Sequence, residues 1–85
     1  MPTVFIPNAL RHLVDDQESV QVPGSSVREV LNNLDPILRE ALLEGTRLKP
    51  NLAVAVDGAV APMGLLERVE AESEIHFIAA ISGGA

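Results

Sequence analysis

The chain has 85 residues, the size of one small domain, and 47% of them are apolar, which is typical of a globular protein. Twelve acids stand against six bases, and this net charge of −6 argues against nucleic acid and anionic membranes as partners and suits docking onto a basic surface. Apart from histidine, the only aromatic residues are Phe5 and Phe77, so no platform for stacking nucleotides is expected. The lack of cysteine excludes disulfides, thiolate metal sites and a thiol nucleophile.

Two short strands are predicted first. Residues 3–6 are mostly β-branched or aromatic, and Pro7 stops or kinks this run. After an irregular continuation of the strand over residues 9–13, residues 19–22 alternate polar and apolar side chains as a half-buried strand does. The two runs predict a hairpin that ends before the Pro23-Gly24 pair.

The clearest local pattern predicts a helix that begins after Ser26. Ser26 and Glu29 have the spacing of a capping box, in which the serine side chain accepts from a free amide of the first turn and the glutamate reaches back to the cap. Four apolar residues at helical spacing share the inner face of this helix: Val27, Val30, Leu31 and Leu34. The helix is expected to end near Asp35.

A second, shorter helix is predicted from Asp35, which can cap it with Pro36 in the first helical position. Four apolar residues are expected on its inner face: Ile37, Leu38, Ala41 and Leu42. Gly45 is the expected stop at the C-terminal end, and residues 46–51 are predicted to be a loop.

The remainder of the chain is predicted to be mostly strands. Residues 52–56 place three apolar side chains on one side, and the Asp57-Gly58 pair that follows is the strongest hairpin-turn signal in the chain. Residues 59–61 form the short return strand. The segment 65–69 fits either one helical turn or extended chain, and after an acidic turn Ile75 opens the last strand.

This order of elements predicts an α+β fold in two layers, with a mixed sheet packed on one main helix and a short second helix. If the last strand lies beside the first, as in a β-grasp fold, it is held on a rigid scaffold and the tail leaves from the edge of the sheet. The predicted domain spans residues 1–81, and residues 82–85 form a flexible tail.

The tail is the most distinctive feature of the sequence. The last strand loses all bulk after Ile81, and the chain ends on Ser82, Gly83, Gly84 and Ala85. Glycine has no Cβ, so such a backbone can enter a narrow cleft, and four or five extended residues reach roughly 13–17 Å. The tail can therefore place its carboxylate in the active site of a partner. The alternative is a frayed terminus with the composition of a linker.

No familiar enzyme site is evident in the sequence. Ser26 is interpreted as a helix cap and not as a nucleophile, and His12 and His76 do not have the spacing of metal ligands. The acids at 15–16 and 70–74 are interpreted as solvated turns. Catalysis by this chain alone is not expected, and no bound metal or cofactor is predicted.

One docking surface is predicted from the alternation of the strands. This alternation places Phe5, His76 and Ile78 on the outer face of the sheet. On adjacent strands, Phe5 and Ile78 would form an exposed apolar patch near the root of the tail, which suggests contact with a partner protein. The alternative is a strand register shifted by one residue, which would reverse both faces.

Taken together, these residues resemble the β-grasp sulfur carrier proteins, a family that includes the small subunit of molybdopterin synthase and the carriers of thiazole and cysteine synthesis. The resemblance covers nearly the whole chain, and the terminal glycine pair is its most specific part. It rests on residues 4–7, Leu10-Arg11, residues 17–22, residues 26–31, residues 54–58 and above all Ile81-Ser82-Gly83-Gly84.

The resemblance implies a carrier mechanism. A ubiquitin-activating-type enzyme would use ATP and Mg²⁺ to convert the carboxylate of Gly84 to an acyl-adenylate, and a sulfur donor would displace AMP and leave a thiocarboxylate. A sulfur-accepting synthase would then take sulfide from this group in the synthesis of cysteine, thiamine, molybdopterin or a secondary metabolite. The carrier would hold no cofactor and no catalytic residue of its own.

Two positions depart from the family pattern. Ala79 stands where many members have proline, which would make this tail less stiff. The chain also ends in Ala85 and not in Gly84, and similarly blocked relatives imply a metal-dependent peptidase, such as a zinc enzyme, that removes the last residue. We expect this removal because an extra residue moves the carboxylate by about 3.5 Å. Alternatively, Ala85 is a remnant of cloning, or the activating enzyme accepts alanine.

Two rival functions stay open. A ubiquitin-like modifier would be joined through Gly84 to lysines of target proteins, and Lys49 is the only lysine at which a chain of such modifiers could grow. A non-covalent interaction module would have an inert tail. The first residues lack the pattern of a signal peptide and no apolar run is long enough to span a membrane, so the cytoplasm is the expected location.

Overall fold

The computed structural model describes residues 1–50 and 52–79 of the chain. Five strands form the main sheet: β1 (Thr3–Phe5), β2 (Ser19–Gln21), β5 (Leu52–Val56), β6 (Ala59–Val60) and β7 (Glu74–Ala79). A separate hairpin is made of β3 (Leu43–Glu44) and β4 (Arg47–Leu48). The helical elements are α1 (Val27–Asn32), α2 (Pro36–Leu42) and the 3-10 helices η1 (Asn8–Val14) and η2 (Gly64–Leu66).

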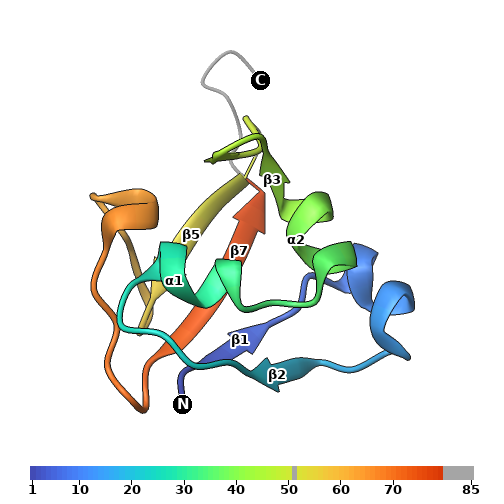
Figure 1. The fold of residues 1–85 in the computed structure, drawn as a ribbon, viewed down its shortest axis with the longest axis horizontal. Coiled ribbons are helices and arrows are strands. Elements are labelled where there is room, and N and C mark those ends of the chain that lie inside the picture. Colours follow the sequence, from blue (N-terminus) through green and yellow to red (C-terminus); the bar gives the residue numbers. More distant parts are fainter. Residues whose placement is uncertain (51, 80–85) are drawn as a thin grey trace.

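The last strand lies in the middle of the main sheet. The strand order is β2-β1-β7-β5-β6, in which β7 runs parallel to β1 and antiparallel to β5 (Figure 1). The predicted hairpin of the first two strands and the predicted contact between the first and last strands are both confirmed. Strand β7 pairs with β1 from Glu74 to His76 and with β5 from Ile75 to Ala79, so its last three residues have a partner on the β5 side alone. The expectation that the tail leaves from the edge of the sheet falls on residues outside the described ones and stays a prediction.

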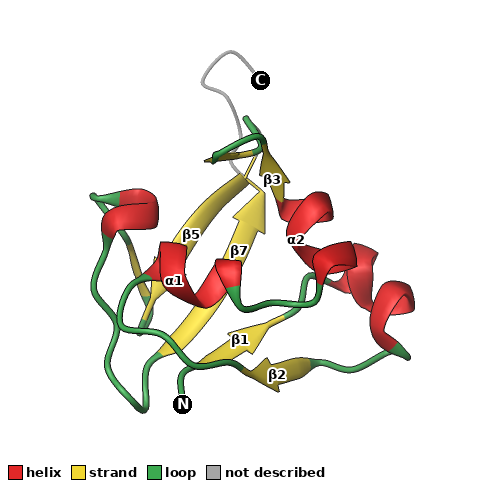
Figure 2. Cartoon of the chain, viewed as in Figure 1, coloured by secondary structure: helices red, strands yellow, loops and turns green. Residues whose placement is uncertain are grey.

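The core lies between one face of the sheet and the two α-helices (Figure 2). The sheet contributes alternate residues, as the period of a strand requires, among them Val4, Val54, Ile75 and Phe77. The helices contribute Val27, Val30, Leu31, Leu38 and Leu42. The predicted α+β arrangement in two layers is thereby confirmed.

Helix α1 begins as predicted and ends earlier than predicted. The Ser26 Oγ accepts a hydrogen bond from the Glu29 amide at 3.2 Å, and the Glu29 carboxylate accepts from the amide of Ser25, one residue before the cap. The helix ends at Asn32, because Asp35 precedes a proline and is held in an extended conformation with ψ of 132°. Leu34 lies beyond the helix and is still buried in the core.

Gly24 allows the segment before α1 to pass very close to that helix. Its φ is +155°, and a Cβ at this position would lie 2.6 Å from Cγ2 of Val30 and 2.7 Å from the backbone nitrogen of Val30. Real Cβ atoms do not approach other atoms so closely, so a larger residue would displace α1 or the segment that leads into it.

Helix α2 confirms the predicted cap and corrects one predicted core residue. The Ile37 amide donates to Oδ1 of Asp35 at 2.9 Å, and Pro36 fills the first turn. Leu38 and Leu42 are buried one turn apart, as expected. Ile37 was expected beside them and is 54% exposed, because successive residues of a helix lie about 100° apart and Leu38 already points at the core.

Two connections form regular structure that the sequence pattern did not predict. Residues 9–13, expected as irregular strand, belong to η1, where the Arg11 Nε donates to the carbonyl of Ile6 at 3.1 Å. The predicted loop over residues 46–51 contains β4, which pairs with β3. Gly45, expected to stop α2, adopts a φ of +67° in the turn of this hairpin, and α2 has already ended at Leu42.

The predicted turn at Asp57-Gly58 is confirmed. Both residues have positive φ, +52° and +88°, as a type I′ hairpin turn requires. The ambiguous segment over residues 65–69 contains both alternatives. It begins in η2 and continues as extended chain, where Arg68 makes an isolated antiparallel bridge with Ser26.

Candidate functional site

The described part of the chain ends at the carboxyl end of β7. Ala79, the last described residue, pairs with Leu52 of β5. The predicted tail residues Ser82, Gly83 and Gly84 and the predicted processed residue Ala85 lie outside the described residues. Their roles therefore stay predictions, and the boundary at residue 81 does too. Strand β7 leads into the tail residues in the sequence. It pairs with at least one other strand along its whole length.

The three predicted docking residues share the outer face of the sheet. Phe5 on β1 lies directly opposite His76 on β7, and their rings stack with centroids 4.3 Å apart and planes 5° from parallel. Ile78 lies two residues farther along β7 on the same face and is 42% exposed. Phe5 and Ile78 were expected to form a pair, but the direct neighbour of Phe5 is His76, and Ile78 lies opposite Ala53.

Three further residues complete this surface and were missed from the sequence. The registers of neighbouring strands place Phe5, His76, Ala55 and Val60 in one row across β1, β7, β5 and β6. Ala53 lies beside Ile78 on the same face. We call Phe5, Ala53, Ala55, Val60, His76 and Ile78 the outer-face patch. The alternation of residues 52–56 and the Asp57-Gly58 turn together could have predicted the three missed members.

The shape of the outer-face patch follows from its side chains. Ala53 and Ala55 are the smallest side chains of the patch and Ala55 is buried, only 9% exposed, while Val60 is 61% exposed on the flanking strand β6. Such a contiguous apolar surface on a small domain is typical of a protein interaction site. The patch has one polar member, His76, whose Nε2 lies 3.7 Å from Oε1 of Glu74 on the solvent side.

A hydrogen-bonded cluster fixes the beginning of β7. The Asp57 carboxylate accepts from the Glu74 amide at 2.9 Å and from the Ser73 hydroxyl at 3.1 Å. The Ser73 hydroxyl in turn accepts from the Glu70 amide at 2.8 Å. The acidic turn before β7 was predicted to be a solvated turn, and the structure gives it a further role, since Asp57 ties the β5–β6 turn to the start of the middle strand.

The residues considered for catalysis or metal binding are not brought together. Ser26 is the cap of α1, as predicted. His12 lies in η1 and His76 lies in β7, and no group of three or more His, Cys, Asp or Glu side chains within residues 1–50 and 52–79 could hold a metal ion. Among the same residues, no helix is long and apolar enough to cross a membrane.

Comparison with protein-family models decides which family this is. The model of the ThiS family matches residues 4–84, nearly the whole chain. The chain belongs to the ThiS family. It is thus a member of the β-grasp, ubiquitin-like sulfur carrier proteins, and the predicted resemblance is confirmed. A comparison with curated protein sequences finds no match.

The structure of this ThiS-family protein is similar to three solved structures. CysO in the BexX/CysO complex of Amycolatopsis orientalis superposes with a TM-score of 0.84 at 23% sequence identity, over 99% of this chain and 100% of that chain. CysO of Mycobacterium tuberculosis gives 0.83 at 21% identity, over 95% and 100%. SAMP1 of Haloferax volcanii gives 0.77 at 21% identity, over 98% of both chains. These likenesses support the β-grasp fold.

Proposed function

We propose that this protein carries sulfur as a thiocarboxylate on Gly84 and donates it as sulfide in a biosynthetic pathway. The observation that carries the proposal is the family match, which extends through the Ser82-Gly83-Gly84 segment and ends at residue 84. The proposal includes removal of Ala85 by a peptidase before Gly84 is used, because an extra residue moves the carboxylate by about 3.5 Å.

The chemistry needs activation because a carboxylate is a poor electrophile. An oxygen of the Gly84 carboxylate attacks the α-phosphorus of ATP in a partner enzyme, pyrophosphate leaves, and an acyl-adenylate forms. The sulfur of a donor then attacks the carbonyl carbon and AMP leaves, so that one oxygen of the terminus is replaced by sulfur. The protein contributes position and binding energy remote from the reacting carbon. Five residues separate Gly84 from Ala79, and a chain of that length spans at most roughly 17 Å when fully extended.

The outer-face patch is the surface proposed to hold the body on its partner enzyme. Two of its members, His76 and Ile78, lie on β7, the strand that leads into the tail, so a partner that covers them is well placed to receive the residues that follow Ala79. The CysO of Amycolatopsis forms a complex with BexX, which supports the idea that this fold works while bound to another protein.

Replacing Phe5 by alanine tests this surface. Because an aromatic anchor of an interface is commonly worth more than about 1 kcal/mol, we expect Phe5→Ala to weaken binding to an activating enzyme by roughly tenfold in calorimetric titrations. Ile37→Ala is the matched control, since Ile37 is also a large apolar residue and is 54% exposed on α2, on the opposite side of the sheet. Equal affinities of the two variants would exclude the patch as the docking site.

The central experiment is the intact mass of the protein after incubation with a ubiquitin-activating-type enzyme, a peptidase for Ala85, ATP, Mg²⁺ and a sulfide source. Loss of Ala85 followed by exchange of one oxygen for sulfur supports the carrier. Adducts joined to lysines of other proteins would instead identify a protein modifier. An unchanged terminus, in a system that is active on an established carrier, would identify a non-covalent interaction module.

A further inference from the structure

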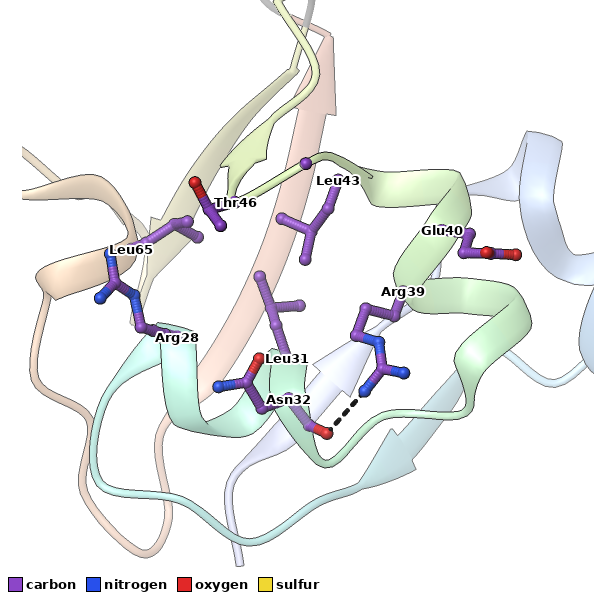
Figure 3. A pocket seen from close by; sticks show the side chains of 9 residues that line it. Arg28, Leu31, Asn32, Arg39, Glu40, Leu43, Thr46 and Leu65 are labelled. Carbon is purple, nitrogen blue, oxygen red and sulfur yellow. Dashed lines mark hydrogen bonds between the residues drawn. The ribbon is translucent and has the colours of Figure 1, made fainter.

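A cleft of about 780 Å³ lies on the helical side of the molecule, away from the outer-face patch. Its walls come from α1, α2, the turn of the β3–β4 hairpin and η2 (Figure 3). Because α1 and α2 pack on the opposite face of the sheet from Phe5 and His76, a ligand in this cleft would leave the outer-face patch accessible. The chemistry proposed for Gly84 makes no use of this cleft.

The cleft is basic in a strongly acidic protein. Two of its residues, Arg28 on α1 and Arg39 on α2, are bases and one, Glu40, is an acid. The other four of the six bases and the other eleven of the twelve acids lie outside it. The cleft therefore carries a local positive charge against a background of negative charge.

The charges of the two arginines are not neutralised within the described chain. Arg39 donates from its Nη1 to the carbonyl of Asn32 at 3.0 Å, which fixes it across the end of α1. The single ion pair found among residues 1–50 and 52–79 is the one between His76 and Glu74, so neither Arg28 nor Arg39 has a carboxylate within 4.0 Å there. Arginines at such a site are suited to bind carboxylates from another molecule.

The lining also indicates what kind of molecule would bind. Figure 3 shows Arg28 beside Leu65 at one end of the cleft and Arg39 next to Glu40 at the other, with Leu43 between them. Small-molecule sites are lined predominantly by apolar and aromatic side chains, whereas five of the nine residues that line this cleft are polar and none is aromatic. An extended peptide can place acidic side chains near both arginines and an apolar one on Leu43.

We propose that this cleft binds an acidic segment of a partner protein, in which acidic and apolar residues alternate. The arginines at the two ends select the acidic side chains, and Leu43 between them selects the apolar one. The protein then has two independent interaction surfaces, a basic cleft on its helical side and the outer-face patch on its sheet.

The test is a titration of the isotope-labelled full chain, followed by amide NMR shifts, with the blocked peptide Ac-Glu-Leu-Glu-Leu-Glu-NH2. We expect saturable shifts in α1, α2, the β3–β4 hairpin and η2, and none in the outer-face patch. Ac-Gln-Leu-Gln-Leu-Gln-NH2 is the control for charge and should produce no saturable shift. Arg28→Gln should weaken binding roughly two- to fivefold, the usual worth of one exposed ion pair.

Arg47→Gln is the matched control variant. It removes the same charge from an exposed position of β4 that does not line the cleft, so peptide affinity should stay the same. Because the side chain of Arg28 makes no hydrogen bond or ion pair within the described residues, its replacement should preserve the fold, which the spectrum itself verifies. Three results would overturn the proposal: no saturable shift with the peptide, equal affinities of the two variants, or equally tight binding of inorganic phosphate at the same residues.

Discussion

Among single residues, Ser26 is one whose role is structural and not catalytic. Its hydroxyl caps α1 and meets no base, so its contribution is to stability. We expect Ser26→Ala to lower the free energy of unfolding by about 1 kcal/mol in urea titrations and to leave sulfur transfer unchanged at a temperature where both proteins are folded.

Ser25→Ala is the control for this prediction. Ser25 is exposed and bonds to the Glu29 carboxylate only through its backbone amide, which alanine keeps. The two variants should therefore differ in stability. A loss of sulfur transfer by Ser26→Ala in the folded state would show that the hydroxyl takes part in the chemistry.

At the scale of elements, β7 shows how one strand serves both the core and the surface. Ile75 is 0% exposed and packs under α1, while Ile78 on the opposite face is 42% exposed. Ile75→Ala should lower the free energy of unfolding by about 2–5 kcal/mol because it removes buried methyl groups and leaves a cavity. Ile78→Ala should change it by no more than about 0.5 kcal/mol.

Both variants replace an isoleucine of β7 by alanine, so they form a matched pair. Thermal or urea unfolding measures the free energy of unfolding of each. Comparable losses of stability would contradict the assignment of the two faces. The complementary expectation is that Ile78→Ala weakens partner binding, whereas Ile75→Ala affects it only through unfolding.

The elements with strong local patterns could be predicted from the sequence. Ser26 with Glu29, Asp35 with Pro36, and Asp57 with Gly58 each fix a cap or a turn by bonds between near neighbours, and the structure confirms all three. The alternation of β7 likewise placed His76 and Ile78 on the outer face.

The features that were missed depend on contacts between distant segments. The pairing of Phe5 with His76 follows from the parallel register of β1 and β7, which are separated by almost the whole chain. The bonds of Asp57 to Ser73 and Glu74, and the meeting of Arg28 with Arg39 at one cleft, likewise arise from tertiary packing. Short-range periodicity carries no information about such contacts.

At the scale of the whole molecule, charge and surface suggest how the carrier finds its enzyme. With a net charge of −6, the protein should associate with a basic docking surface faster at low salt than at high salt. In stopped-flow measurements we expect the association rate constant for an activating enzyme to fall at least about tenfold as the salt concentration rises from roughly 0.01 to 0.5 M.

A variant that carries Glu70→Gln and Glu72→Gln is the control for this prediction. Both residues are exposed in the turn before β7, outside the outer-face patch, and their replacement reduces the negative charge. The salt dependence should become weaker, while the affinity at high salt stays the same. A rate constant that does not change with salt would show that attraction between net charges does not guide the encounter.

The proposed function requires that a main chain without bulky side chains carries the Gly84 carboxylate into the active site of another protein. The most direct measurement is the exchange of pyrophosphate into ATP by the activating enzyme, with a chain that ends at Gly84 as substrate. That chain should support exchange, and a chain with Gly83→Val and Gly84→Val, shown by NMR to have the same fold, should not. Equal exchange of pyrophosphate with both chains would contradict the proposal that the two glycines allow the carboxylate to enter the active site.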